Sequence, residues 1–495
     1  MLTILTTTNH NQQVVDIVAT INRLDELVKI TADINNFDTN AKLLIVEDGE
    51  IKTGLDWHDT KPPYIFPTTE FSADNLLALV FYKLGNHQKA FEIVSNKNDL
   101  YHHLLIATHL QFGYDISEEH INFLKEQSLH NLAIVYNYGA MLKPETMQTI
   151  QNTFESALQE ASNDESKLFS VKHYTNFLID NGHLLDAEKL IKSVIEKAIS
   201  EEAKNALQVQ LSTALMAQIR VPYNQEKLQE ILTLHQKSIA FYEANNLKIN
   251  AGLLLTDAAE VANFQKNFIL SKAFINKAIL YFKEENIPEF LGEATYQKAI
   301  LLYTWSKNGS PQYYKPAINT FQNALKVFKR DTNPQKFADI HHHLALIYSE
   351  IKVSENEKPI WTAFCASSFK EALAFYTQSD HPYQNAMIAH NYATALMGFP
   401  EAKLHNNMDK AFDLFEEALA VRTAEKYPFE RALTLLNQLE LYWLLHNEND
   451  EEETKKYESM LAKANEIHQL VSDTALCEKA NQHLEALEKL KTIIE

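Results

Sequence analysis

The sequence predicts an all-α protein, a solenoid of antiparallel helix pairs with a small atypical cap at its N-terminus. Three observations lead to this fold class. Apolar residues recur at helical spacing almost without pause from residue 71 onward, prolines and small residues repeat at intervals of 46 to 48 residues, and glycine occurs only 10 times in 495 residues. Scarce glycine disfavours phosphate-binding loops and doubly wound sheets, which need glycine in their tight turns.

Composition restricts the function classes. The 45 basic and 65 acidic residues give a formal net charge of −20, and we find no basic stripe, so the sequence disfavours nucleic-acid binding. It holds no run of 18 apolar residues and no secretory leader pattern, so we expect no membrane insertion. Two distant cysteines do not make a disulfide framework. We therefore expect a cytoplasmic protein.

Residues 1–70 differ from the rest and are interpreted as the cap or a small module. We expect a helix from Val14 to Ile34, followed by a small hairpin around the turn sequence at 47–50. Three prolines, Pro62, Pro63 and Pro67, then forbid regular structure.

The repeat is clearest in residues 231–445. Four prolines have spacings of 46, 48 and 46, and an alanine stands ten residues before each; a large apolar residue stands thirteen before and a small residue seventeen before. Further apolar columns follow eleven and fourteen residues after the proline. Small residues let two helices approach closely and large ones fill the grooves, so each unit reads as a helix pair that begins at its proline. The prolines are Pro288, Pro334, Pro382 and Pro428, and a proline-free unit fits the same register at Lys248.

These residues resemble the tetratricopeptide-repeat family. The local matches are Leu77, Ala78, Phe81, Gly85 and Ala90 in one pair, and Tyr174, Leu178, Gly182, Ala187 and Ile191 in another. The resemblance implies a right-handed solenoid whose first helices line the concave face. The later units exceed the family period of about 34 residues, and are similar to the long-period arrays of large bacterial repeat proteins that precede a caspase-like domain, of which we find none in this sequence.

The resemblance and the register divide the chain further. Residues 71–230 read as degenerate helix pairs and 231–445 as the long-period repeats. The tail, 446–495, reads as an acidic loop at ENDEEE followed by two or three capping helices, the last with Leu484, Leu487 and Leu490.

Patterns for catalysis, metal binding or cofactor binding are missing from the sequence. Cys365 shares its repeat position with Ser271, Ala317 and Ala411, so we interpret it as a small packing residue. Successive helical residues point about 100° apart, so the run His341–His343 does not converge on one ion. We predict no enzyme activity, metal or cofactor; a catalytic site around Trp57-His58-Asp59 is a weak alternative to loop packing.

One polar column suggests a binding groove. Nine residues after each reference position stand five polar residues, and by resemblance this column corresponds to one that holds a peptide backbone in some members of the family. Amides suit that role because each offers a donor and an acceptor. The column is Asp257, Gln297, His343, Asn391 and Asn437, with Tyr296, His342, His390 and Glu440 as neighbouring groove candidates.

The leading hypothesis is a non-catalytic scaffold or adaptor that binds a protein or peptide segment in this groove. We find no lysine or arginine at the groove positions, so a neutral or basic partner is expected. The histidines suggest pH-sensitive binding. Two readings stay open beside this one: a ligand-gated receptor whose superhelix changes pitch on peptide binding, and a groove that is merely solvated.

Overall fold

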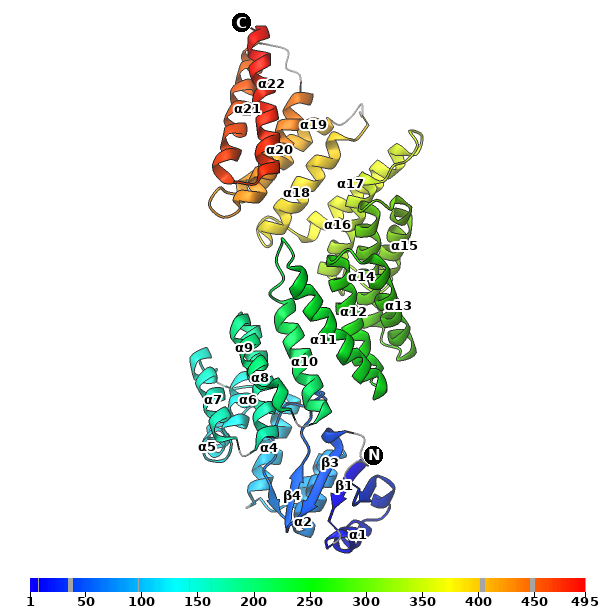
Figure 1. Cartoon of the computed structure of the whole chain (residues 1–495), viewed down its shortest axis with the longest axis vertical. Coiled ribbons are helices and arrows are strands. Elements are labelled where there is room, and N and C mark those ends of the chain that lie inside the picture. The colour runs from blue at the N-terminus through cyan, green and yellow to red at the C-terminus, as the bar shows by residue number, and fades with distance from the viewer. Residues whose placement is uncertain are drawn as a thin grey trace. The chain divides into compact units, whose positions relative to one another are not determined.

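A computed structural model of the chain describes residues 1–7, 9–33, 39–96, 98–141, 143–161, 163–198, 200–400, 406–445 and 450–494. These residues form 22 α-helices and one five-stranded sheet, in two compact units that divide after Asn246. The predicted helical solenoid is confirmed, and the chain is a helical repeat protein (Figure 1). The change of repeat period that we place between residues 230 and 231 falls inside a helix, Gln225–Ala244.

Unit 1 (residues 1–246) begins with the sheet, whose strand order is β2-β1-β3-β4-β5. Strand β1 is parallel to both β2 and β3, while β3, β4 and β5 are antiparallel neighbours. The strands are β1 Leu2–Thr6, β2 Val28–Thr31, β3 Leu43–Glu47, β4 Glu50–Thr53 and β5 Thr69–Glu70.

The expected hairpin is confirmed, and the expected long helix is wrong. Strands β3 and β4 join through Asp48 and Gly49, both at positive φ, as a two-residue turn requires. Helix α1 covers only Asn11–Ala19, because Arg23 takes a left-handed conformation, Leu24–Glu26 form a short 3-10 turn, and Val28–Thr31 pair with β1. Their β-branched side chains favour the strand; the last residue of the expected helix lies outside the described residues.

The remaining helices of unit 1 alternate between first and second members of successive pairs. Even-numbered helices are the first members and odd-numbered helices the second. They are α2 Ala73–Lys83, α3 His87–Ile93, α4 Asp99–Phe112, α5 Glu118–Gln127, α6 Leu129–Tyr138, α7 Met147–Glu160, α8 Asp164–Asp180, α9 Leu184–Val194, α10 Glu201–Met216 and α11 Gln225–Ala244. Gly85 and Gly182, at φ of 84° and 80°, make the turns of the two pairs that most resemble the family.

Unit 2 (residues 247–495) continues the alternation. Its helices are α12 Lys248–Phe264, α13 Phe268–Glu284, α14 Pro288–Lys307, α15 Tyr314–Ala324, α16 Pro334–Glu350, α17 Lys358–Phe375, α18 Pro382–Met397, α19 Asn407–Val421, α20 Pro428–Leu444, α21 Asp450–Leu470 and α22 Thr474–Ile494. All four reference prolines are the first residues of their helices, as predicted.

The repeat columns form the core of unit 2. The column ten residues before the proline (Ala278, Ala324, Ala372, Ala418) has no exposed surface, nor has the column thirteen before it (Ile275, Phe321, Phe369, Phe415). Small residues seat the two helices of a pair close together, and the aromatic rings fill the space between pairs. None of the described helices combines the length and apolar character that a membrane crossing requires.

The C-terminal end holds two helices, α21 and α22, beside α20 (Figure 1). The acidic run differs from the expected loop, because Asp450–Glu453 form the first turn of α21. Carboxylates in a first turn interact favourably with the positive end of the helix dipole, which explains why this charge run is helical. Residues 446–449, which complete the predicted loop, lie outside the described residues.

Candidate functional site

The predicted groove positions recur as a pair on each first helix of unit 2. We call the residues eight and nine positions after the reference proline, or after Lys248, the groove pairs. They are Thr256–Asp257 on α12, Tyr296–Gln297 on α14, His342–His343 on α16, His390–Asn391 on α18 and Leu436–Asn437 on α20. The second member of every pair is half-buried, so its side chain keeps some access to solvent.

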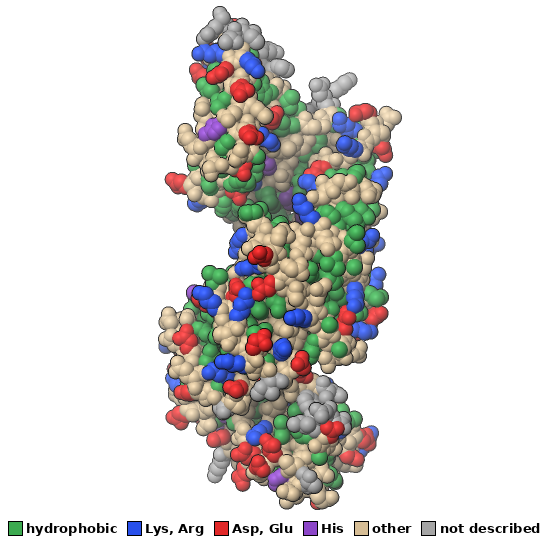
Figure 2. Space-filling model, in the orientation of Figure 1, with side chains coloured by type: hydrophobic (Ala, Val, Ile, Leu, Met, Phe, Trp, Pro, Cys, Tyr) green, Lys and Arg blue, Asp and Glu red, His purple; other side chains and the backbone are tan. Residues whose placement is uncertain are grey.

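Groove pairs on successive first helices contact each other. Nδ2 of Asn391 lies 3.1 Å from Nε2 of His342, and Nδ2 of Asn437 lies 3.3 Å from Nε2 of His390. Asn437 also donates to Oγ1 of Thr394, at 2.9 Å. Figure 2 shows histidine side chains in a hollow of the surface near α18. The structure thus joins α16, α18 and α20 by a polar ladder built from four of the predicted residues.

The histidines of this ladder are neutral at physiological pH. Burial lowers the pKa of His342 to about 3, with the neighbouring His343 as a smaller cause, and it lowers the pKa of His390 to about 3, with Arg422 as the smaller cause. An amide nitrogen only donates, so each Nε2 accepts and each ring proton resides on Nδ1. The expected pH-sensitivity therefore does not come from these side chains, because they do not titrate near pH 7.

Between α14 and α16 the groove pairs are aromatic and carry a nearby cation. The ring of His343 stacks on Phe321, with centroids 5.4 Å apart, and its centroid lies 6.0 Å from that of Tyr296. Lys336 lies over Tyr296, 4.4 Å from the ring centroid, and pairs with Glu293 at 2.9 Å. The expectation of a groove without a basic side chain is therefore wrong. Lys336 stands two residues after the reference Pro334, at a position outside the polar column.

The α12 end of the groove is acidic. Burial raises the pKa of Asp257 to about 7, and the nearby carboxylate of Glu260 adds to the rise. Burial also raises the pKa of Glu260, with Glu293 as the smaller cause. Gln297 donates to Glu293 at 3.4 Å. No described cation pairs with Asp257 or Glu260, so this end of the groove carries uncompensated negative charge near pH 8.

Glu440 lies apart from the ladder. Its side chain is 64% exposed, and its Oε1 is 3.3 Å from Nε2 of His483 on α22. The structure therefore separates Glu440 from the predicted groove set and associates it with the capping helices.

The other singled-out residues of unit 2 pack. Cys365 is fully buried and donates to the carbonyl of Ala345, and burial raises the pKa of its thiol to about 12, so it is a packing residue as predicted. His341 packs against Phe337, with ring centroids 4.4 Å apart. Among the described residues, no group of three potential ligands is placed to hold a metal ion.

Unit 1 contains an occupied groove that the sequence analysis missed. Residues 55–68, here called the proline-rich segment, cross the first helices α4, α6 and α8. Asn131 of α6 accepts from the amide of Ile65 at 2.9 Å and donates to the carbonyl of the same residue at 2.7 Å. Nε2 of His130 is 3.0 Å from the carbonyl oxygen of Pro63. The single side-chain amide of Asn131 thus hydrogen-bonds to both the N–H and the C=O of Ile65.

The same segment is anchored on α8 and α4. Lys172, with only 5% of its side chain exposed, donates to the carbonyl of Trp57 at 2.9 Å and pairs with Asp59 at 2.6 Å. The hydroxyl of Tyr64 is 2.7 Å from Nδ1 of His103. These contacts explain Trp57-His58-Asp59 as a packing motif: Trp57 is buried against Phe169, and Asp59 neutralises a buried lysine.

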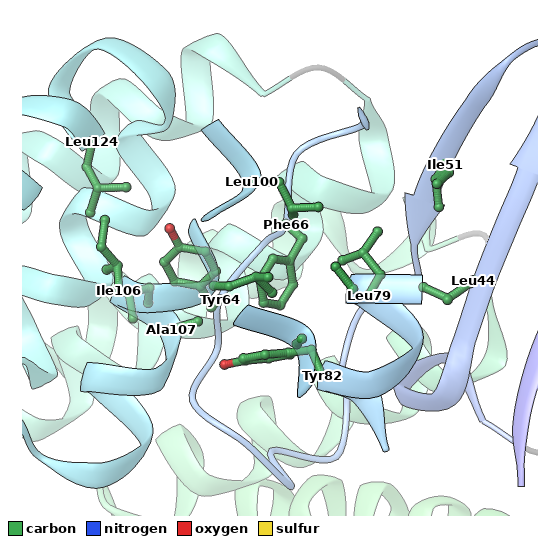
Figure 3. Packing of buried hydrophobic residues seen from close by; sticks show 14 of the residues in the cluster. Leu44, Ile51, Tyr64, Phe66, Leu79, Tyr82, Leu100, Ile106, Ala107 and Leu124 are labelled. Carbon is green, nitrogen blue, oxygen red and sulfur yellow. The ribbon is translucent and has the colours of Figure 1, made fainter. Parts of the chain in front are cut away.

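The side chains of the segment complete the core of unit 1. Figure 3 shows Tyr64 and Phe66 among side chains of the helices, near Leu100 and Tyr82. The ring centroid of Phe66 is 5.3 Å from those of both Tyr64 and Tyr82. Beside the segment lies a cavity of about 460 Å³, lined by residues that include Trp57, His130 and Ser170.

The residues that hold the segment belong to the register of the groove pairs. Counting from the buried small residue of each first helix, Ala133 on α6 and Thr175 on α8, the groove pairs of unit 1 are His130–Asn131 and Lys172–His173. A sequence signal for this was present, because residues 130–133 and 390–393 share the pattern His-Asn-x-Ala. The groove of unit 1 therefore holds a backbone segment that is neither helix nor strand, at the positions that form the ladder in unit 2.

Comparisons with known proteins give fold-level likenesses at low similarity. No protein-family model and no curated protein matches the chain. A solved structure described as the apo form of the quorum sensor NprR from B. thuringiensis is 14% identical, with a TM-score of 0.43 over 70% of this chain and 93% of that one. A structure of Naa15/Naa10 bound to HypK-THB is 12% identical, with a TM-score of 0.24 over 84% and 67%.

A third structure, a circular tandem repeat protein with novel repeat topology, is 12% identical, with a TM-score of 0.17 over 84% of this chain and 88% of that one. All three TM-scores lie below 0.5, and none of these likenesses indicates a function for this chain.

Proposed function

We propose that the chain is a non-catalytic, tetratricopeptide-like scaffold that holds an extended segment of a partner protein in the groove of unit 2. The observation that carries the proposal is the contact between Asn131 and Ile65. In unit 1 this groove-pair asparagine holds a backbone by two hydrogen bonds. Asn391 and Asn437 stand at the equivalent position in unit 2, where the described residues of that unit provide no such segment.

The chemistry of the groove supports binding rather than catalysis. Each asparagine of the ladder uses its Nδ2 as a donor, and no described residue donates to its Oδ1. A peptide N–H can donate to that oxygen, and its C=O can take over the amide hydrogens. The imidazoles are too weakly basic to accept a proton at pH 7. We propose a cytoplasmic location, where thiols such as that of Cys365 stay reduced.

A selection experiment tests the proposal. A display library of random twelve-residue peptides is selected on the full chain, on the variant N391A/N437A and on the control N323A. Asn323 is exposed on the second helix α15, so its substitution should change nothing. We expect peptides that bind wild type and N323A but not N391A/N437A. A set of binders that does not distinguish the three proteins would overturn the proposal.

One observation favours a second candidate, the ligand-gated regulator. The hydrogen bonds that an asparagine offers to a peptide are partly the ones that join α16 to α18 and α18 to α20. A bound backbone would replace these contacts and change how successive first helices are held together. Small-angle scattering of the full chain with and without a selected peptide separates the two candidates: a smaller radius of gyration supports the regulator, and an unchanged radius supports the scaffold.

A further inference from the structure

The proline-rich segment crosses its groove in one direction. The carbonyl of Trp57 contacts Lys172 on α8, and the carbonyl of Pro63, six residues later, contacts His130 on α6. Lys172 and His130 are the first members of their groove pairs, so equivalent positions hold successive points of one backbone. Its chain direction, from N- to C-terminus, therefore runs from the later first helix to the earlier one.

The two ends of the groove in unit 2 differ in charge. Around Tyr296 lie the carboxylates of Asp339, Glu293 and Glu260, which raise the pKa of its phenol beyond the larger effect of burial. With Asp257, these acids line α12, α14 and α16, and Lys336 pairs with only one of them, Glu293.

The opposite end of the groove holds a buried cation, Arg422, beside the ladder. Arg422 directly follows α19, and its positive charge lies close enough to His390 on α18 to contribute to the low pKa of that histidine. Arg422 donates to Thr434 and to the carbonyl of Glu430, close to Pro428, where α20 begins. A cationic side chain of a ligand is therefore attracted by the carboxylates at α12 and repelled by Arg422 next to His390.

We propose that the segment bound by unit 2 runs, from its N- to its C-terminus, from α20 toward α12, and that it carries lysine or arginine in its C-terminal half. The proposal rests on the proposed function, and it adds a direction and a partner chemistry. Asn437 and Asn391 hold the backbone in its N-terminal half, while Asp257 and Glu260 receive the cationic side chains. The occupant is a basic, extended segment of another protein.

The positional composition of the selected peptides tests the charge. Among display peptides that bind wild type but not N391A/N437A, we expect lysine and arginine to be enriched in the C-terminal half over the N-terminal half. Selection on D257N/E260Q should remove the enrichment, whereas E289Q, which changes an exposed glutamate at the start of α14, should keep it. Equal frequencies in both halves, or enrichment in the N-terminal half, overturns the inference while leaving the proposed function intact.

Photo-crosslinking tests the direction. One selected peptide is made twice, with benzoylphenylalanine at its N-terminus or at its C-terminus, and is crosslinked to the full chain before mass spectrometry. The N-terminal probe should label α18 or α20, and the C-terminal probe should label α12 or α14. The reverse pattern overturns the inference. Labelling of unit 1 by both probes contradicts the proposed function itself, because the peptide would then occupy the other groove.

Discussion

The side-chain amide of Asn131 forms hydrogen bonds with both the backbone N–H and the backbone C=O of Ile65, 66 residues away along the chain. The side chain of Asn131 is fully buried, whereas Ile65 is half-buried. The chain thereby carries in unit 1 an example of the recognition that we propose for unit 2: a backbone segment held by an asparagine of a first helix.

The first prediction concerns this contact. Substitution N131A removes both hydrogen-bond partners of the half-buried backbone of Ile65, at a cost of about 1 kcal/mol for each lost hydrogen bond. Hydrogen exchange of the peptides covering residues 60–68 should accelerate at least about tenfold. The control N152A, at an exposed site on α7, should leave that exchange unchanged. Equal protection in N131A and wild type would show that side-chain packing alone holds the segment.

The second prediction concerns acid stability. A buried histidine with a folded-state pKa of about 3 binds fewer protons than its unfolded form, whose pKa is about 6.5, so stability falls as pH decreases from 6.5 toward 3. At pH 5.5 each such histidine costs about 1 kcal/mol relative to pH 7.5. The variant H342Q/H390Q should therefore lose about 2 kcal/mol less than wild type over this range.

Urea unfolding at pH 7.5 and 5.5 measures this difference. The control is H468Q, an exposed histidine on α21, which should follow wild type at both pH values. An identical pH dependence in H342Q/H390Q would mean that the ladder histidines are protonated in the native state.

The third prediction concerns the pH dependence of binding. Asp257 has a raised pKa of about 7, so its carboxylate is mostly protonated at pH 6 and mostly ionised at pH 8. The affinity for a basic peptide should increase several-fold between these values. Titration calorimetry on D257N should give a nearly flat profile at the low-pH affinity. A wild-type profile that weakens as pH rises would contradict the charge that we assign to this end of the groove.

The fourth prediction concerns the packing column that contains Cys365. Alanine already occupies the equivalent position in two neighbouring repeats, as Ala317 and Ala411, so C365A should cost less than about 1.5 kcal/mol. C365L adds volume at a fully buried site and should cost about 1–3 kcal/mol. Thermal unfolding compares the two variants. A large loss in C365A would mean that the thiol does more than fill space.

The sequence predicted the structure best where successive repeats carry the same residue types at equivalent positions. The prolines that start four helices and the small and aromatic columns of unit 2 were predictable because each unit must bury the same faces against its neighbours. Apart from the β3–β4 hairpin, the sheet was not predictable, because its parallel pairing joins β1 to strands distant in sequence. The strand Val28–Thr31 is also too short to give a clear sequence signal. Local pattern carries no information about such pairings.

The candidate site was predicted in position but not in its contacts. The column that contains Asn391 and Asn437 was visible from spacing, whereas its bonds to His342 and His390 depend on how far successive first helices are offset. The segment held by Asn131 was missed because it comes from residues that precede the repeats, and its three prolines indicated only irregular structure. The basic side chain at the groove, Lys336, reaches it from a position outside the polar column.

The central claim is that Asn391 and Asn437 hold the backbone of a bound segment. Isothermal titration calorimetry of a selected peptide with wild type, N391A/N437A and N323A tests it most directly. We predict that the double variant binds at least about 1 kcal/mol more weakly than wild type, since each asparagine loses at least one hydrogen bond to the peptide, while N323A binds as wild type does. Equal affinity in all three proteins would contradict the claim.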